Sequence, residues 1–162
     1  MSKEANMTSK TQIAEGSVAE YVTAMIGGQL FGLPISRVQD VFMPERLTRV
    51  PLSSAEIAGV LNLRGRIVTA IDVRLRLKLP QKKTEIGAGM SVVVDMKGEL
   101  YSLRVDQVGE VLSLPAAKFE RNPPTLDTLW REFSTGIYRL EGKLLVILDV
   151  PRLLDFTKSE AI

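Results

Sequence analysis

The segment GVLNLRGRIVTAIDVRLRL at residues 59–77 recurs in altered form as GIYRLEGKLLVILDVPRLL at residues 136–154. The identical positions include Gly59, Leu63, Gly65, Asp72 and Val73, which align with Gly136, Leu140, Gly142, Asp149 and Val150. A second pair of segments aligns without gaps, GQLFGLPISRVQDVF at residues 28–42 on GELYSLRVDQVGEVL at residues 98–112. Because both pairs occur in the same order, the sequence predicts a duplicated structural unit.

This duplication predicts how the chain is divided. Residues 1–17 are polar and mixed in charge, and we expect them to form a flexible tail. Residues 18–158 are expected to form a single domain made of two similar subdomains, residues 18–84 and 85–158, between which strands can exchange.

Most of each copy has the composition of β-strands. Short runs rich in Val, Ile, Leu and Tyr are typical of half-buried strands, and they occur at residues 21–26, 30–35, 66–71, 91–94, 100–105 and 143–148. Glycines lie between paired runs, where a tight hairpin turn needs a positive φ angle that glycine adopts without a steric clash. The pattern predicts hairpins, and short strands at even spacing favour small barrels or a sandwich.

Helix is expected to be limited. Ser53 and Glu56 have the spacing of a capping box, which predicts a short helical piece before Gly59. Asp72 and Asp149 each end a strand and are predicted to cap a following turn. A short amphipathic helix is predicted for residues 125–133. The fold class expected from the sequence is therefore mainly β with few short helices.

Composition limits the possible functions. The chain has 162 residues, a formal net charge of +2, no cysteine and no histidine. Disulfides, thiolate zinc sites and histidine-based catalytic triads are therefore excluded, and we expect neither a cofactor nor an enzyme activity. No run of about 18 apolar residues is present, so direct membrane insertion is not expected and the cytoplasm is the predicted location.

Two alternative functions stay open at this level. Small barrels bind single-stranded nucleic acid through basic grooves with stacking aromatics, and basic residues gather at Arg64, Arg66, Arg74, Arg76, Lys78, Lys82 and Lys83. No aromatic residue lies among them, and the alternation of Arg74, Arg76 and Lys78 with leucines favours a solvated strand face. The other alternative is a hydrolase that uses Asp72 and Asp149 as a carboxylate pair.

The segment IAGVLNLRGRIVTAIDVRLR at residues 57–76 resembles the signature of the CheW family of bacterial chemotaxis coupling proteins. Supporting segments occur in family order, namely FGLPISRVQDVF, LTRVP, VDQVGEVLSL and GKLLVILDVPRLL, and together they cover about residues 19–156. The resemblance implies two small five-stranded SH3-like β-barrels related by the duplication. It also implies a scaffold without catalytic activity that couples chemoreceptors to the CheA histidine kinase.

The resemblance further implies which residues bind these partners. The family's Asn-Leu-Arg-Gly motif falls on Asn62, Leu63, Arg64 and Gly65, and its Val-x-Glu motif falls on Val38, Gln39 and Asp40. Val38, Asp40, Asn62, Arg64 and Gly65 are thus the receptor- or kinase-binding candidates, and Arg64 is the first choice because arginine is enriched in interface hot spots.

Each candidate also has a structural interpretation. Arg64 could make an internal salt bridge at the hairpin, Gly65 could be purely conformational, and Val38 could pack in the core. Asp40 replaces the usual glutamate, and its shorter side chain reaches less far toward a partner. Phe119 is a weaker kinase-binding candidate that could equally lie beneath a loop. The implied partners are the cytoplasmic tip of a chemoreceptor and the regulatory domain of CheA, and they would recruit the protein to membrane receptor arrays. Nucleic acid is not an expected partner.

Overall fold

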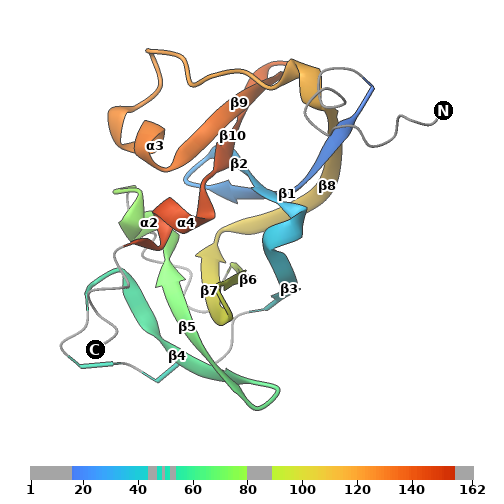
Figure 1. Cartoon of the computed structure of the whole chain (residues 1–162). Coiled ribbons are helices and arrows are strands. Elements are labelled where there is room, and N and C mark those ends of the chain that lie inside the picture. Colours follow the sequence, from blue (N-terminus) through green and yellow to red (C-terminus); the bar gives the residue numbers. More distant parts are fainter. Residues whose placement is uncertain (1–15, 44–46, 49, 52–53, 80–88, 156–162) are drawn as a thin grey trace.

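The computed structural model describes residues 16–43, 47–48, 50–51, 54–79 and 89–155, which form two five-stranded sheets (Figure 1). The first sheet has the order β8-β1-β2-β10-β9, and its strands are β1 (Val18–Ile26), β2 (Gln29–Pro34), β8 (Gln107–Pro115), β9 (Ser134–Leu140) and β10 (Lys143–Leu148). The second sheet has the order β3-β6-β7-β5-β4, and its strands are β3 (Val38–Phe42), β4 (Ile57–Leu63), β5 (Arg66–Asp72), β6 (Met90–Met96) and β7 (Glu99–Val105).

Helices are few and short in the described part of the chain. They are the 3-10 helices η2 (Ile35–Arg37) and η3 (Ala116–Lys118) and the α-helices α2 (Val73–Arg76), α3 (Thr128–Glu132) and α4 (Val150–Leu153). The predicted fold class, mainly β with two five-stranded units and few helices, is confirmed.

The two sheets are equivalent under the internal repeat. The first sheet combines β1 and β2 with β8, β9 and β10, and the second combines the matching β6 and β7 with β3, β4 and β5. Even the register of the parallel strands repeats, because Val146 lies opposite Phe31 in the first sheet and the equivalent Thr69 lies opposite Tyr101 in the second. Each sheet therefore takes strands from both halves of the chain, in a reciprocal exchange.

The apolar core follows the same relationship. Its largest cluster contains residues of both sheets, such as Phe31 and Leu103, and residues of α2 and α4, such as Val73 and Leu153. A smaller cluster belongs to each sheet, and equivalent positions fill them: Tyr138, Leu145 and Ile147 in the first, and Leu61, Val68 and Ala70 in the second. Strands buried on both faces explain the nearly continuous apolar runs of the sequence.

Both predicted aspartate caps are confirmed. Asp72 accepts a hydrogen bond from the Leu75 N–H at the start of α2, and Asp149 accepts one from the Arg152 N–H at the start of α4. Such a cap binds one of the backbone donors that a helix start leaves unpaired. The two carboxylates that a hydrolase would need therefore have structural roles at helix starts.

Three predictions of local structure need correction. The alternating segment after Asp72 is not a solvated strand face, because Val73–Arg76 forms α2 once Asp72 caps it. The helical piece predicted before Gly59 is wrong, since β4 begins at Ile57; Ser53 itself lies outside the described residues. The helix predicted for residues 125–133 exists but is shorter, because Asp127 caps it and it begins at Thr128.

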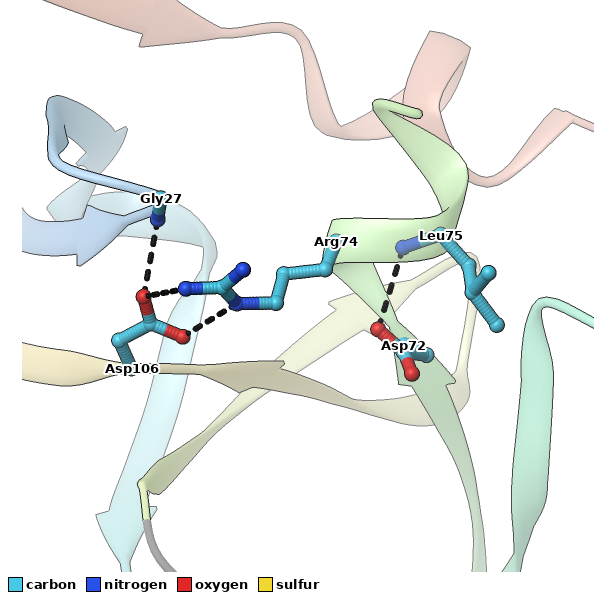
Figure 2. Close-up of polar contacts among 5 residues, drawn as sticks. All are labelled: Gly27, Asp72, Arg74, Leu75 and Asp106. Carbon is cyan, nitrogen blue, oxygen red and sulfur yellow. Dashed lines mark hydrogen bonds and ion pairs between the residues drawn. The ribbon is translucent and has the colours of Figure 1, made fainter. Parts of the chain in front are cut away.

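A polar junction joins the two sheets where β7 passes into β8 (Figure 2). Asp106 lies between these strands and accepts hydrogen bonds from both sides. The Arg74 guanidinium of α2 donates to its two oxygens from Nε at 2.9 Å and from Nη2 at 2.7 Å, and the Gly27 N–H of the β1–β2 turn donates at 2.8 Å. The side chains of Arg74 and Asp106 are only 13% and 18% exposed. One carboxylate thus holds together elements of both sheets.

Candidate functional site

The β4–β5 hairpin turn presents the residues of the predicted Asn-Leu-Arg-Gly motif. Arg64 and Gly65 occupy the turn with φ angles of 52° and 84°, as a two-residue hairpin turn with both central residues in the left-handed region requires. The Gly65 N–H donates a 2.9 Å hydrogen bond to the Asn62 side-chain oxygen, which holds the turn in this shape. A Cβ at Gly65 would meet no atom within 4 Å, so this glycine is needed for its φ angle.

Arg64 forms an ion pair with Asp40 of β3. Arg64 Nη1 lies 2.7 Å from Asp40 Oδ2, so the internal salt bridge considered from the sequence does form. The Arg64 side chain is nevertheless 75% exposed, against 26% for Asp40. The shorter carboxylate of Asp40 therefore reaches Arg64 within the chain and leaves most of the guanidinium open to solvent. The pair therefore links β3, one edge of the second sheet, to the turn that follows β4, the opposite edge.

The ion pair makes a small part of the stability dependent on pH. The hydrogen bond from Arg64, followed by that from the Val41 N–H, lowers the pKa of Asp40 below its ordinary value. A lowered pKa in the folded state adds stability above the unfolded-state pKa, and this gain is lost as the pH falls through the folded-state pKa.

We expect Asp40→Asn to lower the free energy of unfolding at neutral pH by up to about 1 kcal/mol, since the pair is largely exposed. The difference from wild type should shrink as the pH falls below about 4, the ordinary aspartate pKa. Urea unfolding of both proteins at several pH values measures it, and Arg64→Met provides the matched removal of the partner. A difference that stays constant with pH would contradict this account.

Val38 and Phe119 are not part of this charged turn. Val38 is half-buried at the start of β3 and packs against the main core cluster, as its structural interpretation predicted. Phe119 follows η3 on the first sheet and is 38% exposed. The structure therefore brings together Asp40, Asn62, Arg64 and Gly65, and it places Phe119 on a separate surface. We call the first group the Arg64 turn.

An apolar groove of about 500 Å³ surrounds Phe119 on the first sheet. Its lining includes three large apolar side chains that are exposed to solvent, Val18 at 61%, Ile35 at 40% and Phe119 at 38%. We call this surface the Phe119 groove. Val18 and Ile35 were not singled out from the sequence. A signal for Ile35 was present, because it ends a predicted strand run and follows Pro34, the last residue of β2.

Aromatic side chains support this groove. The Tyr138 ring makes edge contacts with Tyr21 and Phe119, each with ring centroids 5.5 Å apart. The Tyr21 and Tyr138 hydroxyls lie 3.4 Å apart, and burial, aided by this contact, raises the pKa of Tyr21. The Tyr21 phenol therefore stays neutral at physiological pH. Rigid aromatic surface that is partly open to solvent is typical of protein-binding sites.

Two of the basic residues considered for nucleic-acid binding are engaged within the chain. Arg74 is held by Asp106, while Arg76 donates to the Leu153 carbonyl at 2.8 Å and lies 4.5 Å from the centre of the Phe133 ring. Lys82 and Lys83 lie outside the described residues. Arg74 and Arg76 thus have internal partners. Within the described ranges, no helix is long and apolar enough to span a membrane.

A mainly β domain with a charged turn on one sheet and an apolar aromatic groove on the other belongs to the class of small protein-binding modules. Residues 20–158 match the family model of the CheW-like domain, and the chain belongs to the CheW family. The chemotaxis protein CheW of Klebsiella aerogenes is 33% identical over 136 residues, which cover 83% of this chain and 81% of that protein.

Other relatives agree over nearly the whole length. The chemotaxis protein CheW of Rhizobium meliloti is 23% identical over 155 residues, which cover 96% of this chain and 99% of that protein. The crystal structure of the scaffolding protein TtCheW from Thermoanaerobacter tengcongensis matches with a TM-score of 0.76 and 28% identity, and it covers 85% of this chain and 93% of that one. The similarity extends across both sheets.

Proposed function

We propose that this protein is a non-enzymatic scaffold of chemotaxis signalling that couples chemoreceptors to the CheA histidine kinase. The match to the CheW-like domain across both sheets is the main support, together with relatives named as chemotaxis and scaffolding proteins. The protein acts in the cytoplasm and reaches the membrane only through its partners. Asp72 and Asp149, the one carboxylate pair considered for catalysis, act as helix caps.

Two separate surfaces suit a protein that holds two partners. The Arg64 turn belongs to the second sheet, whereas the Phe119 groove belongs to the first. The segment of β2, η2 and β3 connects them, since Ile35 lines the groove and Asp40 pairs with Arg64. We assign the receptor tip to the surface around the Arg64 turn and the regulatory domain of CheA to the Phe119 groove.

Such a scaffold acts by holding its two partners next to each other. A protein that binds receptor and kinase at once turns the second binding event into an intramolecular one and so raises the effective concentration of the partner. A change in the receptor can then alter the kinase through differences in contact between two states of the assembly.

We expect Arg64→Glu to weaken receptor binding by about tenfold or more, because it reverses an exposed charge and places two carboxylates together at the turn. Pulldown with receptor-containing membranes measures the binding, and circular dichroism checks the fold. Lys143→Glu, an equal charge change at the equivalent hairpin, is the control. Normal receptor binding by folded Arg64→Glu protein would remove Arg64 from the site.

The whole assignment can be tested by sedimenting receptor membranes with CheA and this protein. All three should be found in the pellet, and Phe119→Ser should remove the kinase while leaving the receptor complex. Retention on single-stranded nucleic acid that falls with salt would favour the alternative function instead. A natively folded protein that binds neither receptor nor kinase would exclude the coupling function.

A further inference from the structure

Under the internal repeat, the junction that Asp106 fills has an equivalent second junction elsewhere in the structure. Where β7 passes into β8, Asp106 binds Gly27 of a hairpin turn and Arg74 of α2. Where β2 passes into β3, the equivalent positions are occupied by Ser36 of η2, Lys97 of the β6–β7 turn and Pro151 of α4. The second junction therefore lacks both the central carboxylate and the arginine that binds it.

A pocket of about 440 Å³ is found at this second junction. It is lined by Arg37, Met96, Lys97, Pro151, Arg152 and Asp155. Arg37 of η2, Lys97 of the hairpin turn, and Pro151 and Arg152 of α4 come from the same three kinds of element as the first junction. Ser36, the equivalent of Asp106, lines the Phe119 groove instead. A pocket thus lies between the hairpin turn and the short helix that are equivalent to those joined by Asp106.

The charges of this pocket favour an anion. Its lining has three cations, Arg37, Lys97 and Arg152, against the single carboxylate of Asp155. None of the three cations has an ion-pair partner within the part of the chain that the structure describes. Asp155 also interacts electrostatically with Arg76. Burial lowers the pKa of Arg76, and the negative charges of Glu56 and Asp155 act in the opposite direction and raise it.

We propose that this pocket binds an acidic side chain of a partner protein, between elements equivalent to those that the Asp106 carboxylate joins at the first junction. A volume of about 440 Å³ lies within the range of ligand pockets and exceeds what one small anion needs. Met96 and Pro151 provide apolar walls for the methylene groups of a glutamate, while Lys97 and Arg152 pair with its carboxylate. Only the identity of the partner depends on the proposed coupling function.

The test uses the full-length ¹⁵N-labelled protein and a capped tetraglutamate peptide, with inorganic phosphate in a parallel titration. The peptide should cause saturable shifts at the amides of Arg37, Lys97 and Arg152. Arg152→Glu should weaken the peptide about tenfold or more, and Lys97→Glu should act in the same direction. Lys143→Glu, an exposed charge outside the pocket, should change the affinity less than about twofold.

Three results would overturn the inference. Shifts of equal size at every exposed basic residue would indicate general attraction, as would equal losses for Arg152→Glu and Lys143→Glu in folded protein. Phosphate binding as tightly as the peptide would assign the pocket to a small anion. Peptide binding in the pocket by a protein that fails to sediment with receptor and kinase would support this site while removing the coupling function.

Discussion

Asp106→Ala should lower the free energy of unfolding by about 3 kcal/mol, because it removes the carboxylate that binds the largely buried guanidinium of Arg74. The same change removes the acceptor of the Gly27 N–H and so loosens the β1–β2 turn from α2. The contacts are short, with the Arg74 nitrogens at 2.7 Å and 2.9 Å from the carboxylate, and both side chains are under one-fifth exposed. Charged partners in this geometry bind strongly because little water screens them.

Chemical unfolding followed by the single tryptophan, Trp130, measures this loss, since the indole packs against Phe31 of the core. The matched control is Glu120→Ala, which breaks the exposed Arg139–Glu120 pair and should cost less than about 1 kcal/mol. The double variant Arg74→Met/Asp106→Leu should be closer to wild type than Asp106→Ala, because it removes both largely buried charges together. Equal effects of Asp106→Ala and Glu120→Ala would show that the junction does not join the sheets.

The position of a strand in its sheet decides whether the sequence could predict it. The six runs predicted as strands correspond to β1, β2, β5, β6, β7 and β10, and all are interior strands. The four strands that these runs do not include, β3, β4, β8 and β9, are the sheet edges. Interior strands are buried on both faces and carry continuous apolar runs, whereas β8 alternates between exposed and half-buried residues along most of its length.

The candidate site was predictable only in part, for a related reason. Asn62, Arg64 and Gly65 lie together in one short motif, so local turn chemistry identifies them. Asp40 is 24 residues away from Arg64, and only the fold brings their side chains into contact. The Phe119 groove depends on still more distant segments, from Val18 to Ile147, and no local pattern indicates that they meet. The repeat in the sequence likewise aligns Asp106 with Ser36 and Arg74 with Pro151, but it does not show that a pocket lies beside Pro151.

The repeated glycine at the start of each matched segment has a steric explanation that leads to a second strong prediction. Glu120 forms an isolated antiparallel bridge with Ile137 of β9, through two 2.9 Å backbone hydrogen bonds. A Cβ at Gly136 would lie 2.5 Å from the Glu120 carbonyl oxygen and would also overlap the Phe119 ring. The equivalent Gly59 lies beneath Thr48, which exchanges two 2.8 Å hydrogen bonds with Val60. Both copies therefore need a residue without a side chain next to the point where another segment bridges the strand.

Gly136→Val should therefore lower the free energy of unfolding by about 2–3 kcal/mol, as overpacking of a filled site does, and should displace Phe119 from its groove. Gly142→Ala is the control, because its Cβ would meet nothing within 4 Å and only the φ of 79° opposes it, at a cost of about 1 kcal/mol. Urea unfolding compares the two, and amide shifts of Ile137 and Tyr138 report the displacement. Because the same glycine holds Phe119 in place, kinase sedimentation should fall in folded Gly136→Val protein while receptor binding at the Arg64 turn persists. If Gly136→Val unfolds no more easily than Gly142→Ala and keeps the native shifts, the close approach of Phe119 and Glu120 is not what requires the glycine.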